Sequence, residues 1–136
     1  MNKIAITAIL ILCSVFTQAQ LGTSAKYFKQ NYPTEYESTI KRHALQEWGE
    51  DYTMVVYEIN KQADAIVDIC TQFESKHTRQ LVGAIREWSI DGYVTHNLEQ
   101  VKAMKVVDRK TLIKIYCDWS MVKYEYSKQV KAKGSF

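Results

Sequence analysis

From Thr34 to Lys133 this 136-residue chain contains no proline, and its single proline, Pro33, stands immediately before that stretch. Proline removes a helical hydrogen bond and clashes with the preceding turn, so its absence permits long helices. Apolar residues follow the helical period at positions 52, 55, 56, 59, 63, 66, 70 and 73, and no sustained strand alternation occurs. The sequence therefore predicts an all-α fold, a small helical bundle of four to six helices.

Local signals divide the chain into elements. Thr34 to Glu37 fits a capping box, which predicts that the first main helix begins at Thr34. A short helix is expected before it, over residues 24–31. The remaining expected elements are a helix over 75–88, a turn at 91–93, a short helix over 95–106 and a last helix capped by Asp108.

The most informative local feature is an internal repeat. Met54–Ala65 and Met121–Ala132 are identical at seven of twelve positions, and the ungapped match extends back to pair Asp51 with Asp118. Because residues 109–132 resemble one continuous helix, the match predicts a repeated long helix, at about 34–74 and 108–132. Gly49 would then lie inside the first copy.

A second internal match pairs Ala44–Asp51 with Ala84–Asp91, with four identical residues. The first match has an offset of 67 residues and the second an offset of 40, so no single repeat period exists.

The residues shared by the first match lie on one face of a helix, and that face mixes apolar and polar side chains. One interpretation is a duplicated hairpin about a pseudo-twofold axis, with satisfied buried amides and Glu–Lys pairs. A second is that both copies line one ligand pocket, and a third is that the similarity arose by chance. The candidate ligand-binding residues are Tyr57, Glu58, Gln62, Tyr124, Glu125 and Gln129.

Two tryptophans occupy equivalent places in the second match, Trp48 and Trp88. Buried, they would anchor the core. Exposed, they would be candidate partner-binding residues, because tryptophan is enriched among interface residues that dominate affinity.

Motifs of enzyme chemistry are missing from the sequence. It contains no Gly-x-Ser-x-Gly, no phosphate-binding Gly-rich loop and no Cys-x-x-Cys. Glu74 and His77 have the Glu-x-x-His spacing of a di-metal bundle site, but the second copy that such a site needs is absent. We therefore predict no metal, no cofactor and no catalytic residue, and favour a protein that is not an enzyme.

The N-terminus has the features of a cleavable signal peptide. Lys3 precedes an apolar run over residues 4–16, and Thr17–Gln20 supplies the small residues of a cleavage site. The run is too short to span a bilayer, so no stable membrane span is expected after cleavage. We expect a signal peptide over 1–19 and a single helical domain over 20–136, located in the periplasm or secreted.

Cleavage would remove Cys13 and leave Cys70 and Cys117. An even number of cysteines in an oxidising compartment permits one disulfide. Two buried thiols that never meet explain the sequence equally well.

These features favour an exported, non-enzymatic interaction module, such as an inhibitor, an immunity-type protein or an assembly factor. Its expected partner is another protein of the cell envelope or extracellular space. The net charge of +3 falls to about +2 on cleavage, which does not suit nucleic-acid binding. The alternatives are a carrier of a small ligand or metal between the repeated helices, and a small cell-wall or polysaccharide hydrolase.

Overall fold

A computed structural model describes residues 20–90 and 96–136. The predicted signal peptide and the predicted turn at 91–93 lie outside the described residues. The described part is a small all-α bundle, as predicted, in which the one β-type contact is an isolated bridge between Ser89 and Cys117. None of the described helices combines the length and apolar character needed to cross a membrane.

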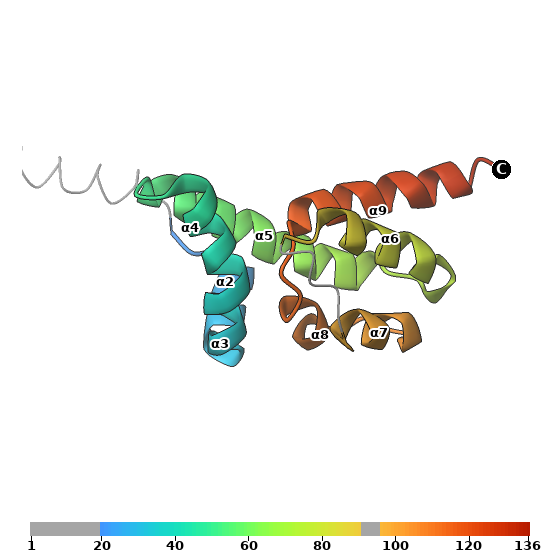
Figure 1. Cartoon of the computed structure of the whole chain (residues 1–136), viewed down its shortest axis with the longest axis horizontal. Coiled ribbons are helices and arrows are strands. Elements are labelled where there is room, and N and C mark those ends of the chain that lie inside the picture. The colour runs from blue at the N-terminus through green and yellow to red at the C-terminus, as the bar shows by residue number, and fades with distance from the viewer. Residues whose placement is uncertain (1–19, 91–95) are drawn as a thin grey trace, which may run out of the picture.

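Helix α5, Tyr52–Gln72, runs through the length of the bundle (Figure 1). It begins at Asp51, whose carboxylate accepts a hydrogen bond from the Met54 N–H (3.2 Å) and so satisfies one of the unpaired donors of the first turn. Its 21 residues extend about 31 Å at 1.5 Å per residue. The buried apolar side chains of α5 are Val55, Ile59, Ala63, Ala65, Ile66 and Ile69.

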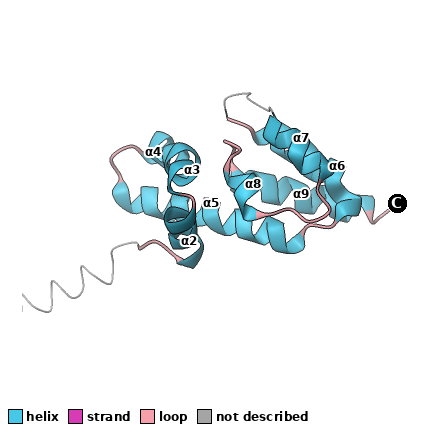
Figure 2. Ribbon diagram, turned by 90° about the horizontal axis from the view of Figure 1, so that it is seen from below, coloured by secondary structure: helices cyan, strands magenta, loops and turns pink. Residues whose placement is uncertain are grey.

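The N-terminal elements pack against the first half of α5 (Figures 1 and 2). They are α2 (Thr23–Asn31), α3 (Pro33–Glu35), the π-helical segment η1 (Tyr36–Lys41) and α4 (Arg42–Trp48). Ala25 and Phe28 of α2 are fully buried, and α4 ends at Gly49. The positive φ of Gly49, 56°, is a conformation that side chains other than glycine rarely adopt.

The C-terminal elements lie beside the second half of α5, with α8 and α9 packed against it (Figure 2). They are the 3₁₀ turn η2 (Ser75–His77), α6 (Thr78–Trp88), α7 (His96–Ala103), α8 (Arg109–Ile113) and α9 (Trp119–Lys133). The largest core side chain here is Trp119, which is 1% exposed. The short helix predicted before Thr34 and the helix over 75–88 are confirmed by α2 and by η2 with α6.

The predicted long helices are wrong. Residues 34–74 are interrupted at Gly49, where the positive φ ends α4 before Asp51 starts α5. Residues 108–132 are interrupted between Ile113 and Trp119, because Asp118 starts a new helix by accepting from the Met121 N–H (3.3 Å). The predicted helix start at Thr34 is also wrong, since Pro33 occupies the first helical position.

Both described cysteines are free thiols, so the disulfide that the sequence permits between Cys70 and Cys117 is not formed. Burial raises the pKa of Cys70 to about 11 and raises the pKa of the fully buried Cys117 well above its ordinary value. Both groups therefore stay protonated and behave as small apolar core residues.

Candidate functional site: a helix-pair repeat with one open face

The two internal sequence matches belong to one repeated unit, a pair of helices. We call α4 with α5 the first helix pair and α6 with α9 the second. In the first pair the Asp51 N–H donates to the Trp48 carbonyl (3.0 Å), and in the second the Asp118 N–H donates to the Trp88 carbonyl (3.0 Å). The same Trp–Asp backbone hydrogen bond therefore links the helices of both pairs.

The second pair contains 27 additional residues between its Trp and its Asp, which include α7 and α8. This insertion accounts for the two offsets, 40 residues for the first helix of the pair and 67 for the second. The isolated bridge between Ser89 and Cys117 brings the two ends of the insertion together. The sequence alone could not place the insertion, because nothing in it marks residues 89–117 as lying between two halves of one unit.

Each pair carries the same four polar residues on its second helix. We call Tyr57, Glu58, Lys61 and Gln62 the first quartet, and Tyr124, Glu125, Lys128 and Gln129 the second quartet. The Glu–Lys ion pairs measure 3.2 and 2.9 Å, and the Gln amide donates to the Glu carboxylate at 3.1 and 2.9 Å. The Lys ammonium lies over the Tyr ring at 5.9 and 5.6 Å from its centroid. The predicted Glu–Lys pairs are confirmed.

The first quartet holds the beginning of α9. Gln62 is 1% exposed, and its carbonyl oxygen accepts from the Trp119 N–H (2.5 Å), a donor of the first helical turn that α9 itself cannot satisfy. The amide of Gln62 also donates to the Asp118 carboxylate (2.8 Å). One buried glutamine thus binds both the helix start and its capping residue.

Asp118 is held in its ionised form. Burial alone would raise its pKa, but hydrogen bonds from Gln62, Ser120 and the Met121 N–H, with the nearby His43 imidazole, lower the pKa below its ordinary value. The His43 Nε2 lies 4.0 Å from the Asp118 Oδ2. The sequence marked Asp118 only as the partner of Asp51 in the repeat.

The chain from Ile113 to Ser120, which we call the covering segment, lies over the first helix pair and η1. Besides Gln62 and His43, it contacts Thr39, which donates to the Ile113 carbonyl (2.9 Å), and Gln46, which accepts from the Tyr116 hydroxyl. The Arg42 guanidinium lies 4.5 Å from the centroid of the Tyr116 ring. The last inserted residues and the start of α9 therefore cover one face of the first pair.

The equivalent face of the second pair is open. At offsets of 40 and 67 residues, the equivalents of Thr39, His43, Gln46 and Gln62 are Arg79, Gly83, Arg86 and Gln129, and all four equivalents are exposed. In the second quartet, hydrogen bonds from Lys128 and Gln129 lower the pKa of Glu125, and Glu125 raises the pKa of Lys128. The quartet is assembled in the same way, with nothing in the described chain placed over Gln129 as the covering segment is over Gln62.

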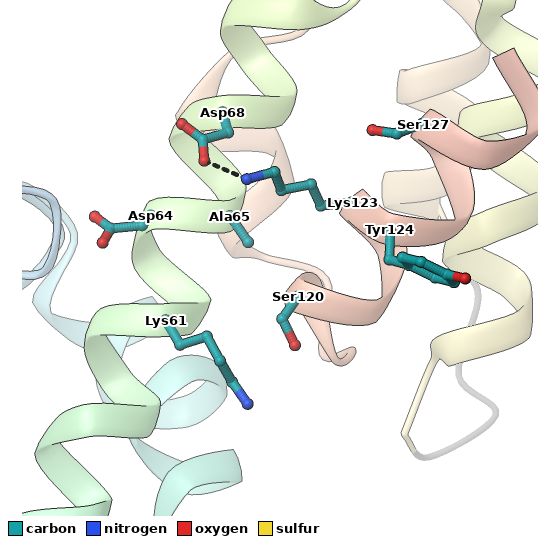
Figure 3. Close-up of a pocket in the computed structure, with 8 residues that line it drawn as sticks. All are labelled: Lys61, Asp64, Ala65, Asp68, Ser120, Lys123, Tyr124 and Ser127. Carbon is teal, nitrogen blue, oxygen red and sulfur yellow. Dashed lines mark hydrogen bonds and ion pairs between the residues drawn. The ribbon is translucent and has the colours of Figure 1, made fainter. Parts of the chain in front are cut away.

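A groove of about 570 Å³ separates α5 from α9 on the exposed side (Figure 3). Lys123 reaches from α9 to Asp68 on α5, where its ammonium lies 2.7 Å from a carboxylate oxygen. The other lining residues are Lys61, Asp64, Ala65, Ser120, Tyr124 and Ser127. The groove therefore offers charges of both signs beside Tyr124 of the second quartet.

The six candidate ligand-binding residues do not line one pocket in the described structure. Gln62 is buried against the covering segment and Glu58 is buried beside it, whereas Tyr57 and Tyr124 are 56% and 60% exposed. Of the six, only Tyr124 lines the groove between α5 and α9. Both glutamine amides were expected to be buried; this is confirmed for Gln62 and wrong for Gln129, which is exposed.

The two tryptophans differ in exposure. Trp48 is 40% exposed, and its indole N–H donates to Glu58 (3.4 Å). Trp88 is half-buried, and its indole N–H is buried with no partner among the described residues. Neither is a fully buried core anchor; in the described structure that role belongs to Trp119.

The described residues contain no group of three His, Cys, Asp or Glu side chains close enough to hold a metal ion. Glu74, of the Glu-x-x-His spacing, is exposed and pairs with Lys76 (3.3 Å), while His77 is buried. Comparisons with protein-family models, curated proteins and solved structures find no match.

Proposed function

We propose that this chain is an exported, non-enzymatic interaction module that binds another protein of the cell envelope or extracellular space through the open face of its second helix pair. The export part of the proposal rests on the signal-peptide features of residues 1–19. N-terminal sequencing of the protein purified from its source should give Gln20 as the first residue.

One observation carries the binding part. The first pair, together with Thr39 of η1, uses His43, Gln46 and Gln62 to bind a segment of polypeptide, and the second pair presents its equivalents of these residues to solvent. A face that already binds polypeptide in one copy of a repeat is a reasonable binding face in the other.

The internal contact also indicates what such a partner would present. The first quartet binds the start of a helix, at Asp118, Trp119 and Ser120, and it does so through an N–H of the first turn and the capping carboxylate. Gln129 has the same carbonyl and amide, and its amide already donates to Glu125 (2.9 Å). We infer that the partner contributes a helix start capped by an acidic residue.

The groove between α5 and α9 supports a second candidate, a carrier of a small ligand. Its volume of about 570 Å³ falls within the range of small-molecule sites, and Lys61, Asp64, Asp68 and Lys123 would suit a ligand with both charges. The Asp68–Lys123 ion pair (2.7 Å) already neutralises one charge of each sign, so the protein-binding candidate is the better supported.

A hydrolase has the least support. The two carboxylates that line the groove, Asp64 and Asp68, both lie on α5, so they stand on one wall and do not flank a bond from opposite sides.

The natural probe for the proposal is the covering segment extended through more of α9, made as a free peptide of residues 113–128. Titrated into the ¹⁵N-labelled mature protein, it should shift the side-chain amide resonances of Gln129 and the backbone resonances near Glu125. Gln129→Leu should abolish the binding because it removes the carbonyl and the amide that meet the helix start.

Gln72→Leu is the matched control, since Gln72 is also exposed but ends α5, outside both quartets. A peptide with Asp118→Ala, which lacks the capping carboxylate, should bind more weakly. Resonance shifts that survive Gln129→Leu, or that are the same for both peptides, would count against recognition of a capped helix start.

A further inference from the structure

A second groove, of about 480 Å³, lies on the open face of the second pair, at α6. It is lined by Thr78, Arg79, Val82, Gly83, Arg86 and Lys102, so α6 provides the floor and one wall and α7 contributes Lys102. Three of the six lining residues are cations and none is an acid.

Few of these charges are neutralised. Lys102 pairs with Glu99 (2.7 Å), and Lys102 and Arg86 together lower the pKa of that carboxyl group. Arg79 and Arg86 form no hydrogen bond or ion pair within the described part of the chain. With Glu99 included, the groove retains an excess of two positive charges.

Gly83 is unexplained by the packing of α6. Glycine in a helix interior is unfavourable relative to alanine, and a Cβ built at Gly83 would meet no atom within 4 Å. A residue without a side chain does, however, let another molecule approach the helix backbone closely. Gly83 lies between Arg79 and Arg86 on the same face of α6, one turn from each.

The repeat indicates what the position of Gly83 would contact in a bound partner. Gly83 is the equivalent of His43, whose imidazole faces the Asp118 carboxylate, and Arg86 is the equivalent of Gln46, which contacts the covering segment at Tyr116. The face of the first pair therefore accommodates an acidic side chain at this place. In the second pair two arginines replace the neutral Thr39 and Gln46.

We propose that the groove of Arg79, Gly83, Arg86 and Lys102 binds an acidic peptide segment, with two or more carboxylates, immediately before the helix start that docks on Gln129. This inference rests on the proposed function and names the chemistry of its partner. Arginine forks bind carboxylates through paired hydrogen bonds, and the two excess charges match two carboxylates. The segment runs along α6 as residues 113–118 run along η1 and α4.

The test uses a second peptide, residues 113–128 with Lys114→Glu and Tyr116→Glu, compared with the unsubstituted peptide by calorimetry at 50 mM NaCl. Tyr116 contacts the equivalent of Arg86 in the first pair, and Lys114 follows the residue that contacts the equivalent of Arg79. The acidic peptide should bind roughly fivefold more tightly, and most of that gain should disappear at 300 mM NaCl.

Arg79→Gln with Arg86→Gln should remove the gain, so that the acidic and the unsubstituted peptide bind the double variant with the same affinity. Lys110→Gln, which removes an exposed charge from α8, should preserve the gain. Gly83→Ala should weaken the acidic peptide at least threefold without lowering the thermal midpoint, because its methyl group would stand on the floor of the groove.

The two proposals fail in different ways. If the unsubstituted peptide binds at Gln129 but the acidic peptide binds no better, the acidic-segment inference is overturned and the proposed function stands. If neither peptide shifts Gln129, the proposed function is overturned. If the acidic peptide keeps its gain in affinity for the double arginine variant, the inference is also overturned, because its carboxylates would then be bound by other residues.

Discussion

Replacing Gln62 by leucine should destabilise the protein far more than the same replacement at Gln129. The two residues are repeat equivalents, and both donate to the glutamate one turn earlier. They differ in what else they bind, because Gln62 is buried and holds Trp119 and Asp118, whereas Gln129 is exposed.

The expected loss of unfolding free energy follows from the polar groups that Gln62→Leu leaves without a partner. Gln62→Leu keeps the side-chain volume similar but strands the buried Trp119 N–H, at about 1–3 kcal/mol, and removes a charge-assisted hydrogen bond from Asp118, at about 1.5–3 kcal/mol. Because the two losses share one side chain and are not additive, we expect a total of about 3–4 kcal/mol. Gln129→Leu should cost less than about 0.5 kcal/mol, the usual effect of a surface substitution.

Urea unfolding followed by circular dichroism at 222 nm measures both free energies of unfolding, with unchanged m-values as the check on two-state behaviour. Equal losses for the two variants, or a loss below 1 kcal/mol for Gln62→Leu, would refute the claim that the first quartet is a structural contact and the second an unoccupied one.

The remaining predictions concern helix caps, pH and thiols. Asp51→Ala should cost about 1 kcal/mol in urea unfolding, because it removes the acceptor for the Met54 N–H; no loss would contradict the cap. The lowered pKa of Asp118 contributes stability that is present above its ordinary pKa of 3.8 and is lost as pH falls through the folded value, so Asp118→Asn should flatten the stability profile below about pH 4. Because the pKa of Cys70 is raised to about 11, iodoacetamide at pH 8 should alkylate it about 100-fold more slowly in the folded protein than in the protein unfolded in urea. Dithiothreitol should not shift the thermal midpoint, and a shift would indicate a disulfide.

The sequence predicted the fold class and much of the repeat. Helical periodicity and the lack of proline after Pro33 were sufficient for an all-α bundle, and the match of Asp51 with Asp118 identified the register of the two copies. The continuity of each copy was mispredicted because helix period continues through both Asp residues. Two local features end the helices despite that periodicity: the positive φ of Gly49 and the hydrogen bonds by which the two aspartates cap new helices. A periodic pattern of apolar residues does not report either feature.

The site was less predictable than the fold. The shared Tyr, Glu, Lys and Gln were recognised as a mixed helix face, and their Glu–Lys pairs are confirmed. Identical sequence could not indicate that Gln62 would be buried and Gln129 exposed, because the difference arises from the covering segment, which is distant from α5 in the chain. Arg79 and Gly83 were missed because they lie before Ala84, where the second match begins, and Arg86 was missed because the match pairs it with an unlike residue, Gln46. Their three equivalents in the first copy all contact the covering segment.

Photo-crosslinking tests the central claim most directly, that the second helix pair binds a partner where the first pair binds its own chain. A benzoylphenylalanine placed at Tyr124, in the second quartet, is compared with one at Tyr57, its exposed equivalent in the first. After irradiation in envelope extract of the source organism, the probe at position 124 should yield one protein that is lost with Gln129→Leu, and the probe at position 57 should not yield it. The same protein captured equally at both positions, or captured undiminished by the Gln129→Leu variant, would contradict the account.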